Sequence, residues 1–388
     1  MLGQRRRRAL RLTASAVGAT AAAGTPLFLL GALAVEIRAE LGFGEAGLGL
    51  AIATMFVASA ATGPVVIRVI ERIGAFAGVV VTSVLGAAAL ATIALAVDGY
   101  RGLLAAMAVA GIAQAFGQPA ANGLLARGLA EARQATAFGI KQSAIPLTSL
   151  LAGAALPLVA LTVGWRWAFG GAAVLLLALP LLVPRRDTST APRRSGRGAV
   201  SAPLLWLAVG VALAAAATMS LPTFLVETAV ARGIAPATAG ALLVWGSTAS
   251  IAARLALGWV ADQVGRDPLP AVAALLVVGA PGVALLGVEA GWAALVGATT
   301  VAFGLGWGWN GLLDAAVVRR HRETPAAATS LMLTGLFAGA ASGPLVFGGL
   351  VSQFGHRPAW LAAAAALLAG AACLGVAGAL WRRPAPGP

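Results

Sequence analysis

The fold is indicated by a stretch that occurs twice, Ile67-Arg68-Val69-Ile70-Glu71-Arg72-Ile73-Gly74 and, 191 residues later, Gly258-Trp259-Val260-Ala261-Asp262-Gln263-Val264-Gly265. In both copies an acidic residue and a glycine stand at the same spacing between two apolar runs. Because loops drift by insertion, a constant offset across several landmarks indicates an internal duplication. Three further pairs recur at this offset: Val35-Glu36 with Val226-Glu227, Gly117 with Gly308, and Trp165–Phe169 with His356–Trp360.

The composition is typical of a membrane protein. Of the 388 residues, 60% are hydrophobic and 10% are charged, and the mean hydropathy is +0.90. A soluble domain carries about 25% charged residues, so most of this surface must face lipid. The net charge of +14 comes from arginines in short breaks between apolar runs, not along one helix face, which argues against a nucleic-acid partner. Cys373 is the only cysteine, so no disulfide forms within the chain.

Twelve apolar runs are long enough to cross a membrane, which takes roughly 20 residues each. Backbone groups in lipid must pair within their own segment, and the runs lack the alternation of barrel strands, so we expect helices. The sequence predicts an all-α integral membrane protein with two pseudo-symmetric six-helix bundles, 1–184 and 202–388, and an arginine-rich cytoplasmic linker at 185–201. The predicted spans are 12–35, 46–67, 75–97, 101–126, 135–163, 167–184, 202–226, 237–260, 268–288, 291–317, 326–351 and 358–381.

The arginines orient these spans. With the N-terminus inside, the inner segments hold 20 arginines and the outer segments hold five, namely Arg38, Arg101, Arg166, Arg232 and Arg357. Cytoplasmic loops are enriched in basic residues, so both termini are predicted to lie in the cytoplasm of a multi-pass inner- or plasma-membrane protein.

The N-terminus also resembles a twin-arginine export signal, because Arg5 to Arg8 precede an apolar stretch. That apolar run continues to Val35, however, and eleven more spans follow. We therefore expect the stretch to be an uncleaved first span.

The repeated loop carries a family resemblance. Residues Gly258 to Arg266 resemble Gly-x-x-x-Asp-Arg/Lys-x-Gly-Arg, the cytoplasmic loop signature of the major facilitator superfamily, and they fall between the predicted spans 8 and 9. The first copy keeps Glu71, Arg72 and Gly74 but has Ile67 for the first glycine. The resemblance implies a secondary transporter that works by alternating access. It also implies that spans 1, 4, 7 and 10 line a cavity, and that spans 2, 5, 8 and 11 form the rocking interface.

The same resemblance implies a conformational latch. Glu71 and Asp262 would face the positive N-terminal ends of spans 11 and 5, and would hold the cytoplasmic side shut. The alternative is that both are solvated loop carboxylates. The predicted latch residues are Glu71, Arg72, Gly74, Gly258, Asp262, Gly265 and Arg266.

A shorter resemblance lies in span 5. Residues Phe138 to Pro146 are similar to the Gly-x-Lys-Gln-x-x-x-Pro stretch of cyanate-permease-like bacterial anion carriers. Drug–proton antiporters of the superfamily instead carry a glycine-proline signature in span 5. Here that pattern occurs in span 11, with Gly343-Pro344 and Gly348-Gly349, and the shift in position argues against drug efflux.

Polar residues inside lipid are costly, and each is a candidate site. Gln114, Gln118 and Asn122 follow one another at intervals of four, so they share one face of span 4. In span 10, Asn310 and Asp314 have the same spacing, and Trp307 lies one turn earlier. We predict that both stripes line the solute cavity; the alternative is interhelical hydrogen bonding that only holds the bundle together.

Lys141 is the only lysine among 27 basic residues. A compact, titratable ammonium in span 5 is suited to attracting an anionic solute or to releasing a proton. The alternative is that its side chain snorkels back to the cytoplasmic surface.

Three more charged residues lie near or within spans. Arg254 in span 8 is a second anion contact, or else it pairs with Asp262 or Asp314 or snorkels. Glu36 and Glu227 end spans 1 and 7 on the outside, where symmetric carboxylates serve as gates or proton sites, or simply sit at the membrane interface.

The chain lacks the marks of an enzyme. Its two histidines, His321 and His356, lie in loops, and the sequence contains neither a phosphate-binding loop nor a cluster of metal ligands. We expect no cofactor, no metal and no catalysis. The prediction is a gradient-driven symporter or antiporter that works as a monomer on a small anionic organic solute, with the lipid bilayer as its other partner. Two alternatives remain open: proton-coupled multidrug efflux, and a transporter-like membrane sensor that moves nothing.

Overall fold

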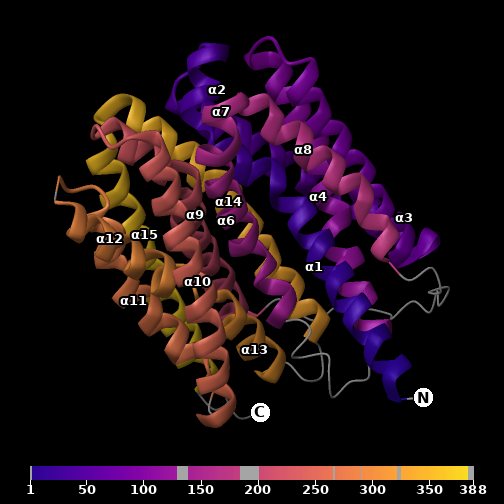
Figure 1. The fold of residues 1–388 in the computed structure, drawn as a ribbon. Coiled ribbons are helices and arrows are strands. Elements are labelled where there is room, and N and C mark those ends of the chain that lie inside the picture. The colour runs from indigo at the N-terminus through magenta and orange to yellow at the C-terminus, as the bar shows by residue number, and fades with distance from the viewer. Residues whose placement is uncertain are drawn as a thin grey trace. The chain divides into compact units, whose positions relative to one another are not determined.

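The computed structural model describes residues 2–128, 139–183, 201–264, 267–289, 291–320 and 325–382, and every regular element among them is a helix (Figure 1). The predicted all-helical class is thereby confirmed. The elements are α1 (Leu2–Ala32), α2 (Ala34–Leu41), α3 (Glu45–Leu95), α4 (Tyr100–Gly128), α6 (Ala144–Ala155), the π-helix η1 (Leu156–Ala160), α7 (Leu161–Val163), α8 (Trp165–Ala178), the 3₁₀-helix η2 (Leu179–Leu182), α9 (Ala202–Ala231), α10 (Pro236–Val264), α11 (Leu269–Leu285), α12 (Trp292–Val301), the π-helix η3 (Ala302–Gly306), α13 (Asn310–Arg320), α14 (Pro325–Phe354) and α15 (His356–Arg382).

Within the described ranges, nine helices are long and apolar enough to cross a membrane. Their outer faces carry large apolar side chains that are exposed to the surroundings, such as Leu158, Leu175 and Leu181 at 72%, 72% and 80%. A water-soluble protein rarely exposes so much contiguous apolar surface, so these faces are suited to contact with lipid.

Helix α3 is long enough for two spans. Its 51 residues would extend over about 77 Å at 1.5 Å per residue, more than twice the hydrocarbon thickness of a bilayer. The helical path is interrupted at Gly74, whose φ of 84° and ψ of 166° are not helical. A positive φ is accessible to glycine at little cost. The glycine of the first loop copy therefore has a structural reason: it allows the chain to turn between the predicted runs 46–67 and 75–97.

The predicted span 291–317 is not one continuous helix, and here the expectation was wrong. The chain forms α12, widens into the π-helix η3, leaves helical bonding at Trp307–Trp309 and resumes as α13. Glycines at 304, 306 and 308 explain the difference, since glycine weakens a helix and permits close approach of other backbones. The preceding α11 has only 17 residues.

The chain divides into two compact units. Unit 1 comprises Met1–Gly44, Ala51–Pro192 and Ala229–Val244, and unit 2 comprises Glu45–Leu50, Arg193–Thr228 and Trp245–Pro388. Two short pieces thus join the unit that does not hold their sequence neighbours. Close backbone contacts account for both: Gly49 meets Pro344 within unit 2, and Gly240 meets Gly153 within unit 1.

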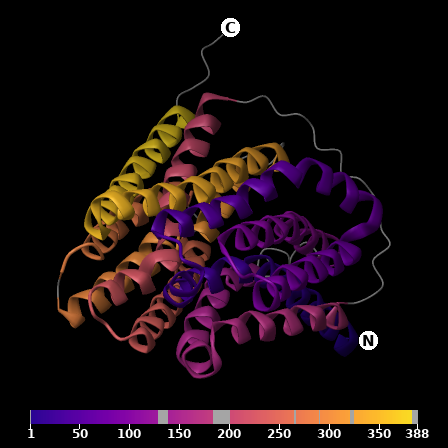
Figure 2. The same ribbon diagram turned by 90° about the horizontal axis from the view of Figure 1, so that it is seen from above.

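Small residues hold each unit together. In unit 1, α1 packs along α4 (Figure 1), where Gly117 lies against Ala19 and Ala23. In unit 2, α14 lies against α9 and beside α15, the last two helices in yellow tones in Figure 2. Backbones that approach this closely leave room only for glycine and alanine, as membrane helices commonly do. The stripe that makes the α14–α9 contact is Gly335, Gly339 and Gly343.

Candidate functional site

A polar cluster in unit 1 joins residues that the sequence placed in two different spans. The Lys141 ammonium donates to Gln118 Oε1 at 2.9 Å and to Asn122 Oδ1 at 2.7 Å. Lys141 is only 3% exposed, so its side chain turns inward toward α4 instead of extending to the surface. We call Lys141, Gln118 and Asn122 the lysine cluster.

The chemistry of the lysine cluster follows from the donor. An ammonium group only donates hydrogen bonds, so the amide atoms that face it are necessarily the oxygens. Each amide therefore directs its oxygen to Lys141 and keeps its NH₂ group for other partners. A cluster built from an ammonium and two amide NH₂ groups offers donors and positive charge, which is the complement of an anion.

Gln114 extends this stripe by one turn of α4. Its side chain is half-buried, and its Oε1 atom is buried without a hydrogen-bond partner among the described residues. A buried polar atom without a partner costs free energy unless water or a ligand satisfies it. The predicted face of Gln114, Gln118 and Asn122 thus carries both a paired segment and an unpaired one.

In unit 2 the polar residues gather where span 10 is interrupted. Arg254 of α10 donates through Nη2 to the Trp307 carbonyl at 2.9 Å, and its Cζ atom lies 5.5 Å from the centroid of the Trp307 ring. Asp314 is close enough for its carboxylate to interact with the guanidinium electrostatically. Asp314 is one of the partners that the sequence suggests for Arg254.

Other buried polar atoms surround this interruption. Trp309 is 1% exposed, and its indole Nε1–H has no partner within the described residues. The same holds for Asn310 Oδ1 on a half-buried side chain and for the Ser250 hydroxyl, which is 0% exposed. Buried polar atoms of this kind are normally satisfied by water or ligand.

The predicted latch lies largely beyond what the structure describes. Glu71 and Arg72 are exposed, and Gly74 makes the turn in α3. Gly258 has open space around it. The Asp262 side chain, Gly265 and Arg266 lie outside the described residues, as do the start of span 5 and the side chains at the start of span 11. The contacts predicted for Glu71 and Asp262 stay predictions.

The two symmetric carboxylates differ in their surroundings. Glu36 in α2 is half-buried, and burial raises the pKa of its carboxyl above the ordinary range. Glu227 in α9 is 4% exposed. Its neighbour Thr228 accepts a hydrogen bond from the Trp360 indole at 3.1 Å. No group of three histidine, cysteine or acidic side chains suited to a metal ion occurs in the part of the chain that the structure describes.

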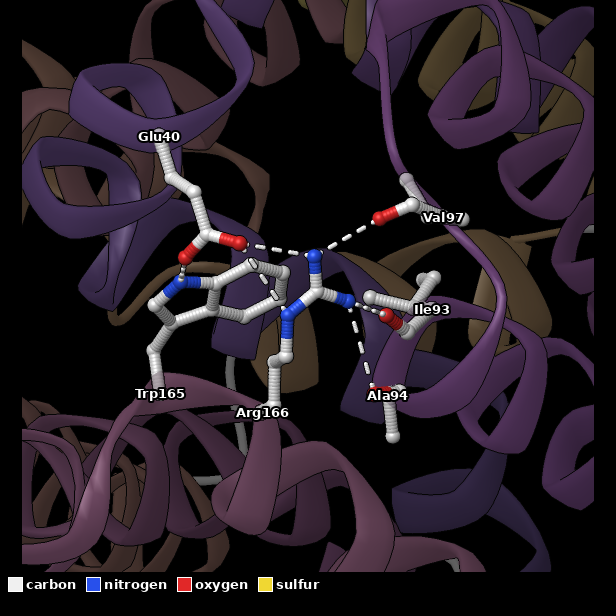
Figure 3. Close-up of polar contacts among 6 residues, drawn as sticks. All are labelled: Glu40, Ile93, Ala94, Val97, Trp165 and Arg166. Atoms are coloured by element: carbon white, nitrogen blue, oxygen red, sulfur yellow. Dashed lines mark hydrogen bonds and ion pairs between the residues drawn. The ribbon is translucent and has the colours of Figure 1, made fainter.

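An arginine clamp in unit 1 was missed by sequence reasoning (Figure 3). Arg166 bonds Glu40 Oε1 through Nη2 at 2.7 Å and through Nε at 3.1 Å. Its remaining donors reach the carbonyls of Ile93, Ala94 and Val97 at the end of α3. The clamp ties together α2, α3 and α8. The only signal was its place in the repeated Trp165–Phe169 landmark.

Trp165 completes this clamp. Its indole N–H donates to Glu40 Oε2 at 2.7 Å, and its ring centroid lies 4.6 Å from the Arg166 Cζ atom. Hydrogen bonds lower the pKa of the Glu40 carboxyl, and the larger effect comes from Arg166 and the smaller from Trp165. Charge-assisted bonds of this kind favour the ionised carboxylate.

A second arginine clamp lies in unit 2. Arg320 at the end of α13 bonds Asp267 Oδ2 at 2.6 Å, and its Cζ atom lies 4.8 Å from the centroid of the Trp381 ring. Asp267 Oδ1 also accepts the backbone N–H of Leu269 at the start of α11. This clamp fixes the far end of α13 to α11 and α15.

Comparisons with known proteins agree with the helical architecture. A family model described as Major Facilitator Superfamily matches residues 16–326. The structure is similar to a bacterial homologue of the human lysosomal transporter Spinster in its inward-facing, unoccupied conformation, with a TM-score of 0.79, 16% identity and 99% of both chains covered. The nucleoside transporter NupG, in a variant form, gives a TM-score of 0.73 at 14% identity over 95% of this chain and 99% of its own. Comparison with curated protein sequences finds no match.

Proposed function

The chain belongs to the Major Facilitator Superfamily, and we propose that it is a secondary active transporter for a small anionic organic solute. It carries a transporter fold made of apolar helices, which implies a membrane and a small-molecule solute as its partners. The proposal adds the charge class of the solute, the alternating-access mechanism and the residues that bind.

The lysine cluster is the observation that supports an anionic solute. Its ammonium is nearly inaccessible to bulk solvent, and the amides beside it direct their oxygens inward to Lys141. The cluster itself offers a solute positive charge and the N–H donors of the two amides, and Gln114 Oε1 one turn away is an acceptor without a partner in the described chain. A neutral amphiphile would need acceptors and apolar surface here, and a cation would be repelled.

We extend the proposal to unit 2. Trp307, Asn310 and Asp314 stand at the interruption of span 10, where Asn310 Oδ1 is a buried atom without a partner in the described chain. The proposed solute contacts are Gln114, Gln118, Asn122 and Lys141 in unit 1 and these three residues in unit 2. Asp314 interacts electrostatically with Arg254, so it does not act as an isolated negative charge against an anion.

The proposed topology has twelve spans with both termini on the cytoplasmic side. Of the described helices nine qualify by length and composition. Counting α3 as two spans, and adding α11 and the interrupted segment Trp292–Arg320, gives the twelve that the sequence predicts. The arginine asymmetry supports cytoplasmic termini. We propose that a monomer in the inner or plasma membrane is sufficient for transport.

We favour an anionic solute over drug efflux. Two glycines of the displaced antiporter-like pattern in span 11, Gly339 and Gly343, meet the carbonyls of Ala212 and Ala216 in α9. They are thus explained by helix packing. A sensor that moves no solute differs from a carrier in one measurable respect, which is net uptake across a sealed membrane.

Ligand-induced stabilisation tests the anion class directly. Purified protein would be heated with small carboxylates, phosphate esters and neutral and cationic analogues of the same size, since a ligand that binds only the folded state raises the unfolding temperature. We expect one or more anions to stabilise the wild type and the control Arg382→Gln, whose side chain is exposed. Lys141→Gln should lose this shift. Equal stabilisation of Lys141→Gln, or stabilisation by cations alone, would contradict the anion class.

The latch is tested separately. Asp262→Asn removes one loop carboxylate, and we expect it to alter the balance between inward- and outward-facing states. Single cysteines at inner and outer helix ends, introduced after replacement of Cys373, would report this as changed labelling by a water-soluble maleimide. Unchanged labelling at every site would rule out the latch.

A further inference from the structure

Span 10 consists of two helical segments joined at a break. The segment α12–η3 ends at Gly306, and α13 begins at Asn310, with its first backbone bond from the Leu313 N–H to the Trp309 carbonyl at 3.0 Å. A Cβ atom at Gly308 would collide with the Gly304 carbonyl oxygen, so the break has no room for a side chain there. Short π-helices often mark functional positions in helices.

The segment before the break is fixed to its neighbours. Gly279 of α11 lies directly against the Gly306 backbone, and Gly282 lies against Ala302. On the other side the Trp245 indole donates to Thr300 Oγ1 at 2.8 Å. Close packing of this kind leaves little freedom to move.

The segment after the break is held in a different way. Arg320, at the last position of α13, is tied to Asp267 and stacks on Trp381. The near end of α13 begins at the break itself. Helix α13 therefore has 11 residues, is anchored at its last residue and adjoins the break at its first residue. We call the break at Trp307–Trp309 the joint of span 10.

Arg254 contacts both sides of this joint. Its Nη2 atom donates 2.9 Å to the Trp307 carbonyl, directly after η3, while its charge interacts with Asp314 inside α13. The Trp307 ring, which is 0% exposed and packs at a right angle on Phe303, covers the guanidinium from one side. One side chain of α10 thus bridges the two segments of span 10.

We propose that Arg254 is a positioning residue that sets the joint of span 10 and thereby holds Asn310 and Asp314 in place. Arg254 is proposed to hold the joint whether or not a solute is bound. The claim that Asn310 then meets a solute rests on the proposed function. In this role Arg254 acts through the backbone at Trp307 and through Asp314, and it does not itself bind the solute.

Hydrogen exchange of the purified protein tests the joint without any ligand. Arg254→Gln removes the positive charge and the charge-assisted hydrogen bond to the Trp307 carbonyl. Because such a hydrogen bond is strong, we expect about tenfold faster exchange over residues 307–313. Exchange over α12 and over α4 should stay at the wild-type rate. Arg254→Lys keeps the charge toward Asp314 and should restore part of the protection. Arg382→Gln, an exposed arginine of the same unit, is the matched control.

Two results would overturn the proposal. One is wild-type exchange over 307–313 in Arg254→Gln. The other is a rise that is equal in all helices for both Arg254→Gln and Arg254→Lys, because that pattern marks a general loss of stability and not a local joint.

Uptake kinetics separate positioning from solute binding. If Arg254 positions span 10, Arg254→Lys should lower the turnover number more than it changes KM. A direct anion contact would instead raise KM with turnover preserved. If the protein moves no anion, the proposed function fails while the exchange result still decides the joint.

Discussion

Lys141 is buried beside two half-buried amide partners, and a buried ammonium is tolerated only when its donors are satisfied. A substitution in the lysine cluster is therefore expected to change both the stability of the fold and the preference for a solute. In the sequence, Lys141 was conspicuous because arginine is used at every other basic position. A compact ammonium with three donors can bond both amide oxygens.

We predict that Asn122→Leu lowers the free energy of unfolding by about 1–3 kcal/mol, because it leaves the buried Lys141 with one fewer acceptor. Gln114→Leu is the matched control, since Gln114 makes no hydrogen bond to Lys141. In the background Lys141→Met the cost of Asn122→Leu should largely vanish, and a double-mutant cycle on thermal or denaturant unfolding measures this coupling. Additive effects would mean that the two side chains do not interact.

Glu40 gives a pH prediction. Its pKa is lowered from the ordinary value of 4.5 by Arg166 and Trp165. A carboxyl with a lowered folded pKa stabilises the fold above its ordinary pKa, and this contribution is lost as the pH falls through the folded value. We expect the unfolding temperature of the wild type to fall below about pH 4.5 more steeply than that of Arg166→Gln. Arg101→Gln, at an exposed position, should retain the wild-type slope.

At the scale of elements, glycine spacing decides how closely the helices pack. The stripe Gly335, Gly339 and Gly343 repeats every four residues along α14 and meets a matching row of alanine carbonyls on α9. The pattern was visible in the sequence, but it resembled an antiporter signature. Only the geometry identifies the partner helix.

We predict that Gly339→Ala destabilises the protein by about 1–3 kcal/mol, because the added Cβ collides with the Ala212 carbonyl and the two helices must separate. Gly349→Ala, in the same helix but facing open space, should have no such cost. Thermal unfolding of the two variants in one detergent measures the difference. Equal stability of the two variants would exclude the tight α14–α9 contact.

Helices and their polar stripes could largely be predicted from sequence, because they depend on local spacing. The face of Gln114, Gln118 and Asn122 follows from intervals of four. The joining of Lys141 to that face could not be predicted, since it depends on how α4 and the start of span 5 pack. The break at Trp307–Trp309 was missed because a hydropathy window averages over the glycines that cause it. The Arg166 clamp was missed because its partners include backbone carbonyls, which no side-chain pattern marks.

At the scale of the whole molecule, the two units differ in the chemistry of the cations that they carry. Each unit carries a cation among polar groups, the buried Lys141 in one and the half-buried Arg254 in the other, but their chemistry differs. Lys141 is paired with neutral amides, whereas Arg254 is paired with a carbonyl and with Asp314. We assign the lysine cluster the larger share of anion binding, because the hydrogen bonds from Lys141 to Gln118 and Asn122 go to neutral amides.

The membrane orientation gives a whole-molecule prediction. With Cys373 replaced, Asp98→Cys should be labelled in intact cells by a membrane-impermeant maleimide, because its exposed loop is predicted to lie outside. Ile73→Cys, which is 42% exposed in the first loop copy, should be labelled only after the membrane is opened. The reverse pattern would invert the proposed topology.

Uptake by sealed proteoliposomes shows whether this protein carries an anion that Lys141 attracts. A radiolabelled small carboxylate that stabilises the purified protein would be supplied outside vesicles with an imposed proton or sodium gradient. We expect saturable, gradient-dependent uptake by the wild type and by Arg382→Gln, and a severalfold higher KM in Lys141→Gln. Anion uptake with the same KM in Lys141→Gln, or no uptake of any anion while a cationic dye is exported, would contradict it.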